Sequence, residues 1–151
     1  MFPLTNIDDI THVIQLAVAP VFLLTAIGTL LGVLTNRLGR AVDRSRVLER
    51  VIAELANSGA NPPQREEVHA ELLRLAQRIR LVYTSIVLAV LAALFICLLI
   101  AVAFIDAFIA ANLAKVLGAL FILAMAAMVG CLLVFLREIF LAVSSARSAI
   151  H

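Results

Sequence analysis

The chain has 151 residues and a formal net charge of +2, and 64% of its residues are hydrophobic. Its mean hydropathy is +1.10, whereas an ordinary soluble domain is only about 45–50% apolar. This composition excludes a soluble globular protein and predicts an integral membrane protein, and the length suits one compact domain.

The excess of apolar residues lies in three long runs, which predict three membrane-spanning helices. We expect the first span at about residues 10–35, the second at about 82–105 and the third at about 113–136. Asn112 is a candidate cap for the third helix. A tail at about 137–151 is expected either to lie along the membrane surface or to continue the third helix.

Residues 36–81 form the sizeable segment outside the predicted spans. Apolar residues recur there in steps of three and four on both sides of 57–63, a stretch rich in Asn, Gly and Pro. The pattern predicts two amphipathic helices joined by a short loop. The expected fold class is therefore all-α integral membrane, with three transmembrane helices and a cytoplasmic antiparallel helical hairpin between the first and second.

Basic residues are concentrated on one side of the predicted spans. Eleven of the twelve lie in 36–81 or 137–151, and the remaining one is Lys115. Because positive charge marks the cytoplasmic side of a membrane protein, we expect the N-terminus outside and both the hairpin and the C-terminus in the cytoplasm.

A stripe of small and polar residues follows the first helix. At about 100° per residue its members fall on one arc of about 120°. Gly28 and Gly32 form a small-xxx-small element, which allows close helix contact in lipid. Two interpretations stay open: a packing face, against the chain's own spans or another copy, or the lining of a polar path around an oligomer axis. The candidate residues are Thr25, Gly28, Thr29, Gly32, Thr35, Asn36 and Gly39.

A juxtamembrane ion cluster is predicted where the first helix leaves the membrane. Asp43 lies three residues from both Arg40 and Arg46, so it can bridge them. Glu138, just after the third span, is a candidate partner for one of the arginines. The expected role is structural, or a charge ring at a pore mouth if several copies surround an axis. The predicted members are Arg37, Arg40, Asp43, Arg44, Arg46 and Glu138.

Membrane lipids are the first partner that the charge pattern indicates. Arg37 and Arg44 fall on the opposite side of the helical wheel from the stripe, where we expect them to contact anionic headgroups. Nucleic acid is a poor fit, because the arginines of the hairpin are interleaved with acidic residues and no aromatic platform accompanies them.

The sequence contains no motif for catalysis, for a cofactor or for a metal. Cys97 and Cys131 lie within hydrophobic runs and are expected to be small buried apolar side chains. The three histidines are scattered, and the spans hold no paired acids or Ser/His pair at workable spacing. We therefore expect a protein that is not an enzyme.

Residues 20–49 read PVFLLTAIGTLLGVLTNRLGRAVDRSRVLE. The PVFLLTxIG stretch, the LTNRL turn and the RxxDRxR run resemble the signature of DUF2721, a bacterial membrane family of unknown function. The resemblance implies a small multi-span protein of the bacterial inner membrane. It implies no activity, substrate or catalytic residue.

Two functions follow from these expectations. The first is a non-enzymatic inner-membrane protein that forms a homo-oligomeric helical assembly, with a pore or channel lined by the stripe as its sharper version. The alternative is an accessory or scaffold subunit of a larger membrane protein complex, which docks through its cytoplasmic hairpin.

Overall fold

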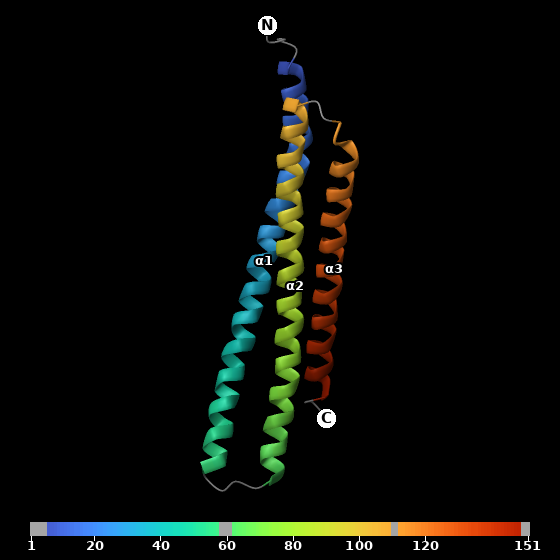
Figure 1. The fold of residues 1–151 in the computed structure, drawn as a ribbon. Coiled ribbons are helices and arrows are strands. Elements are labelled where there is room, and N and C mark those ends of the chain that lie inside the picture. Colours follow the sequence, from blue (N-terminus) through green and yellow to red (C-terminus); the bar gives the residue numbers. More distant parts are fainter. Residues whose placement is uncertain (1–5, 58–61, 110–111, 149–151) are drawn as a thin grey trace. The chain divides into compact units, whose positions relative to one another are not determined.

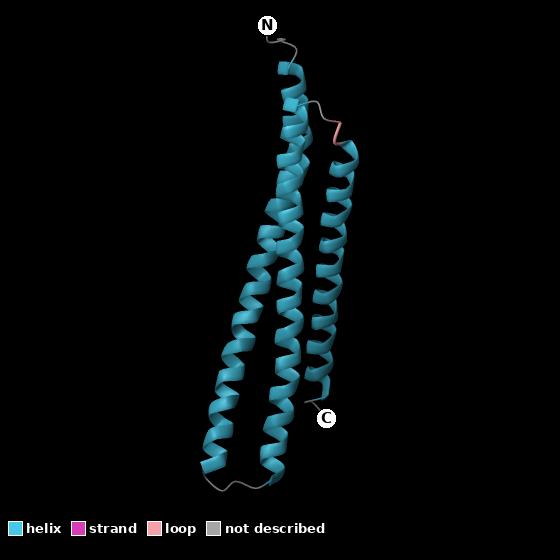
Figure 2. Ribbon diagram, in the orientation of Figure 1, coloured by secondary structure: helices cyan, strands magenta, loops and turns pink. Residues whose placement is uncertain are grey.

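The computed structural model contains three helices, and within the described residues helix is the regular structure present (Figure 2). The predicted all-α class with three helices long enough to span a membrane is confirmed. The helices are α1 (Asn6–Asn57), α2 (Pro62–Ile109) and α3 (Ala114–Ser148) (Figure 1). The residues described are 6–57, 62–109 and 112–148. Residues 1–5, the loop centre at 58–61, residues 110–111 and the end of the predicted tail at 149–151 lie outside them.

Each predicted span forms one continuous helix with the segment next to it. α1 has 52 residues and α2 has 48, whereas a bilayer core needs about 20. α2 begins with two prolines, which suit the first positions of a helix, and no glycine or proline follows them to interrupt it. The tail after the third span continues α3 as far as Ser148, which is one of the two expected alternatives.

Asp106 closes the turn between α2 and α3. Its Oδ1 accepts a hydrogen bond from the backbone N–H of Leu113 at 3.0 Å. The carbonyl of Leu113 then accepts the N–H of Val116 at 2.9 Å as the new helix begins. Asn112 has a φ of 55°, in the left-handed region that Asn tolerates better than most residues. The prediction that Asn112 caps α3 is therefore wrong, because a cap residue has an extended backbone and Leu113 immediately precedes the helix.

The chain divides into two compact units, and each contains part of all three helices. Unit 1 comprises Met1–Leu31 and Val87–Cys131, and unit 2 comprises Gly32–Ile86 and Leu132–His151. Their compositions differ sharply. Unit 2 holds every charged residue of the chain except Asp8, Asp9, Asp106 and Lys115.

Unit 1 buries small side chains together with Ile27 and Ile96, and it exposes many large apolar side chains. Ala89, Ala92 and Ala124 are buried, with at most 1% of each exposed, while Phe22 and Phe108 are both 72% exposed. Small interior residues let helix backbones approach closely, which is how helices associate in lipid. All three helices are long and apolar enough to cross a membrane, and the outward aromatic and aliphatic side chains suit a lipid environment.

The buried residues repeat every seven positions along the helices. On α1 and α3 they are seven or fourteen apart, and on α2 they advance mainly in alternating steps of three and four. This repeat is typical of helices that pack along their length. The residues are Ile27, Leu34 and Leu48 on α1, Leu75, Val82, Ser85, Ala89, Ala92 and Ile96 on α2, and Ala124, Cys131 and Glu138 on α3.

Candidate functional site

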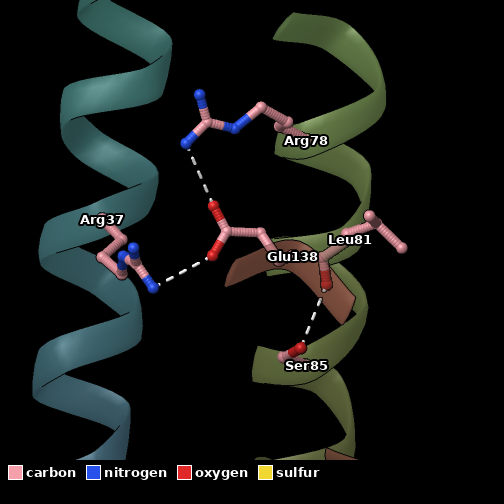
Figure 3. A network of polar contacts seen from close by, with 5 residues as sticks. All are labelled: Arg37, Arg78, Leu81, Ser85 and Glu138. Atoms are coloured by element: carbon pink, nitrogen blue, oxygen red, sulfur yellow. Dashed lines mark hydrogen bonds and ion pairs between the residues drawn. The ribbon is translucent and has the colours of Figure 1, made fainter. Parts of the chain in front are cut away.

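A buried carboxylate connects the three helices within unit 2. Glu138 of α3 is only 2% exposed, and it is the one buried charged side chain among the described residues. Its Oε1 accepts a hydrogen bond from Nη2 of Arg78 on α2 at 3.2 Å. Its Oε2 lies 3.0 Å from Nη1 of Arg37 on α1. Figure 3 shows the carboxylate between the two guanidinium groups.

The seven-residue repeat explains why these side chains meet. Glu138 lies seven residues after the buried Cys131, so it occupies the inner face of α3. Arg78 lies three residues after Leu75 on α2, and Arg37 lies three after Leu34 on α1. Residues three or four apart share a helix face. All three charged side chains therefore extend from the faces that the helices bury.

Two further contacts are formed by side chains of the same helices. The guanidinium carbon of Arg37 lies 5.2 Å from the ring centroid of Phe135, one turn before Glu138 on α3, and such cation–π contacts stabilise by roughly 0.5–2 kcal/mol. Ser85 is fully buried, and its hydroxyl donates to the carbonyl of Leu81 at 3.1 Å. That hydroxyl is therefore satisfied within its own helix.

The described part of the chain does not satisfy every polar group of the cluster. Two arginines face one carboxylate, which leaves a net charge of +1 (two minus one). The buried Nε–H of Arg78 has no acceptor among the described residues. Oε2 of Glu138 is close enough to Arg37 for an ion pair but lacks the alignment of a hydrogen bond. The site therefore has spare hydrogen-bonding capacity, and each unpaired buried group costs roughly 1–3 kcal/mol.

A pocket of about 290 Å³ lies beside this cluster, and its polar lining is mainly arginine. One of its lining residues, Arg44, pairs with Glu71 of α2 at 2.9 Å, but the two side chains are 60% and 49% exposed, so the pair contributes little to stability. The lining residues are Arg37, Arg40, Ala41, Arg44, Leu75, Arg78, Val82 and Glu138.

The structure brings together part of the predicted ion cluster. Glu138 contacts Arg37, and Arg40 and Arg44 line the same pocket. Asp43, however, forms no ion pair with Arg40 or Arg46 in the described part of the chain, and all three side chains are exposed. The expected bridge at Asp43 is thus absent, because long side chains on an exposed helix face gain little by giving up solvation and rotamer freedom.

Arg78 is the site residue that the sequence analysis missed. Apolar residues in this segment recur in steps of three and four through Leu75, Ile79 and Val82. The buried face instead passes through Leu75, Val82 and Ser85, with Arg78 between the first two. A seven-residue repeat fitted to α2 places Arg78 and Ser85 in that face, so the signal was present in the spacing.

The small and polar stripe of α1 is not covered by the described part of this chain. All seven of its residues are exposed, and a Cβ added at Gly28, Gly32 or Gly39 would have nothing within 4 Å. The hydroxyl of Thr29 donates to the carbonyl of Thr25 at 3.1 Å, and that of Thr25 to the carbonyl of Val21 at 3.2 Å. The stripe is therefore not a packing face for the described spans of the same chain, which was one of the expected forms.

Comparison with known proteins identifies one family. Residues 17–148 match the family described as a protein of unknown function, DUF2721. No curated protein and no solved structure matches the chain. The match extends the resemblance seen at residues 20–49 over most of the sequence. The chain, with three helices long and apolar enough for a multi-pass membrane protein, belongs to the DUF2721 family.

Proposed function

We propose that this protein is a non-enzymatic protein of the bacterial inner membrane that forms a homo-oligomer through the stripe on α1. One observation carries the proposal. The stripe runs along the helix with every member exposed and with open space at Gly28, Gly32 and Gly39. Small residues on the outside of a membrane helix allow another helix to approach closely.

The spacing of the stripe supports a helix as its partner. Thr25, Gly32 and Gly39 are seven residues apart, and so are Thr29 and Asn36. The same repeat spaces the residues that the chain buries within itself. A sustained seven-residue repeat is typical of a helix that packs on another along its length, and a second copy of α1 supplies a matching row of small residues.

The proposed orientation follows the basic residues. The N-terminus lies outside, and the segment 36–81 and the C-terminus lie in the cytoplasm, where eleven of the twelve basic residues are found. Segment 36–81 then forms the cytoplasmic hairpin. The proposal also takes anionic headgroups at that surface as partners of Arg37 and Arg44.

Substitution of the stripe glycines tests the assembly. Gly32→Leu and Gly28→Leu place a large side chain where another copy would approach, so we expect the purified particle to fall to the mass of a single chain. Leu30→Ile should leave the mass unchanged. Gly118→Leu is the matched control, because it adds the same side chain at an exposed glycine of α3 with nothing within 4 Å. If the variants at positions 28 and 32 keep the wild-type mass, the stripe is not the interface.

The sharper version of the proposal is a pore or channel lined by the stripe. Several copies arranged around an axis would bring their small and polar faces together, and small side chains leave room for water. Flux of ions through liposomes that contain the purified protein tests this version. No flux for any common ion, together with a dry and closed axis in the particle, would rule out the pore and leave the assembly.

A second candidate function is a scaffold that docks another membrane protein subunit through the hairpin. The observation in its favour is exposed apolar surface in the charged part of the chain, where Leu73 is 71% exposed and Val47 is 50% exposed. Extraction in mild detergent distinguishes the two candidates. A protein that is recovered only with copies of itself counts against the scaffold.

A further inference from the structure

We infer that the arginine-lined pocket of unit 2 binds a phosphate group, carried by a lipid headgroup or present as free phosphate. The pocket lies within one unit of a single chain, so the inference does not require self-association. It rests on one part of the proposed function, the contact of Arg37 and Arg44 with anionic headgroups, and adds the binding site and the chemical group that it binds.

The charge of the lining is the first argument. Four arginines and one carboxylate give a net charge of +3 (four minus one). If Glu71 is counted as the partner of Arg44, the net charge is still +2. Like charges around one pocket repel, and they repel more strongly where apolar walls such as Leu75 and Val82 lower the local dielectric. A bound anion relieves this repulsion.

The hydrogen-bonding capacity of the lining is the second argument. Glu138 accepts one hydrogen bond from Arg78 and forms an ion pair with Arg37, while each guanidinium carries five N–H donors. The buried Nε–H of Arg78 has no acceptor among the described residues. Glu138 therefore holds two arginines in place and leaves donors unused. An anion with several acceptor oxygens would use them.

The geometry of arginine favours phosphate as that anion. The planar guanidinium presents parallel N–H groups that match two oxygens of a phosphate. The pocket volume of about 290 Å³ is ample for such a group, since a water molecule in the liquid occupies about 30 Å³. This region also borders a long uncharged run on each helix: its charged residues follow the runs at 10–36 and 116–136 and precede the run at 81–105. Basic pockets between helices at such a boundary are typical sites for lipid phosphates.

The test uses the full-length protein and two probes that separate the sources of phosphate. The first is inorganic phosphate, measured by its effect on the unfolding temperature in neutral detergent against sodium chloride at equal ionic strength. The second is lipid retained from mixed bilayers of phosphatidylglycerol and phosphatidylcholine, measured by mass spectrometry of the intact protein. Arg40→Gln is the test variant, because Arg40 lines the pocket, is exposed and forms no ion pair in the described part of the chain.

Arg46→Gln is the matched control, since Arg46 is exposed on the same helix and outside the pocket. Whichever probe binds the wild-type protein, we expect Arg40→Gln to weaken its binding roughly tenfold, which corresponds to about 1.4 kcal/mol. Arg46→Gln should leave that binding unchanged. Protection by inorganic phosphate assigns the site to a free anion, and selective retention of phosphatidylglycerol alone assigns it to a headgroup. Binding of neither probe, or equal weakening by both variants, overturns the inference. Particle mass measured on the same samples reports on assembly separately.

Discussion

Gly32 and Arg37 lie five residues apart on α1, yet their surroundings are opposite. Arg37 contacts Glu138 and Phe135 of the same chain. Gly32 is exposed, and a side chain added there would meet nothing within 4 Å. Gly32 belongs to one seven-residue repeat on this helix, and Arg37 lies three residues after Leu34, a member of another. The regularity of a repeat therefore does not say whether its partner is inside the chain or outside it.

The difference between the two faces separates two kinds of effect. Side chains that the chain itself pairs, as in the Glu138 cluster, should control the stability of the single chain. Residues that the chain leaves open, as in the stripe, should control what it assembles with. Substitutions in the two regions should therefore change different measurements, and a result that mixes the two would break the comparison.

The largest expected effect on stability comes from Glu138→Gln. The substitution keeps the shape of the side chain but leaves two arginines without their carboxylate, and removal of one partner from a buried ion pair costs roughly 3–5 kcal/mol. We expect a loss of that size in the free energy of unfolding in detergent, with the particle mass unchanged.

Glu71→Gln is the control for this prediction. It removes a carboxylate from the exposed pair with Arg44, where the expected loss is at most about 1 kcal/mol. Equal losses for the two variants would show that burial of Glu138 does not set its contribution.

An intermediate effect is expected for Phe135→Leu. The substitution keeps an apolar side chain but removes the ring that faces the Arg37 guanidinium, and we expect a loss of roughly 1 kcal/mol in unfolding free energy. Phe140→Leu is the control on the same helix, because Phe140 is 66% exposed. If both variants lose the same amount, the contact between Arg37 and the ring contributes nothing specific.

The smallest effect is expected for Thr29→Val. Its hydroxyl donates to the carbonyl of Thr25 in its own helix, so its removal frees no buried partner. Exposed substitutions of this kind usually change stability by less than about 0.5 kcal/mol. We expect unfolding and particle mass both to match wild type. A lower mass would show instead that this hydroxyl bonds across the interface between copies.

The sequence was sufficient for much of the fold. Three apolar runs and the breaker-rich stretch at 57–63 were enough to predict three helices with a break between the first two. The charged segment after the breaker-rich stretch can continue into the second span because residues 64–109 contain no glycine or proline. The turn at Asp106 was harder to predict, since a carboxylate bonded to a backbone N–H seven residues later leaves no periodic pattern.

The site was predictable only in part. A helical wheel placed Arg37 away from the stripe, and the position of Glu138 after the third span made it a candidate partner for one of the arginines of the predicted cluster. Arg78 was missed because the sequence analysis did not place it on a helix face, although its spacing from Leu75 and Val82 puts it beside the buried face. The bridge expected at Asp43 failed for the opposite reason. Correct spacing along a helix does not hold long exposed side chains together.

The central claim is that a second copy covers the stripe of α1. The most direct test is the mass of the wild-type particle purified in mild detergent, combined with an image of its symmetry axis. The proposal predicts a multiple of the 16.3 kDa chain mass, with the first helices of neighbouring copies in contact through Gly28 and Gly32. A particle of single-chain mass, or an oligomer in which these glycines face lipid, would contradict it.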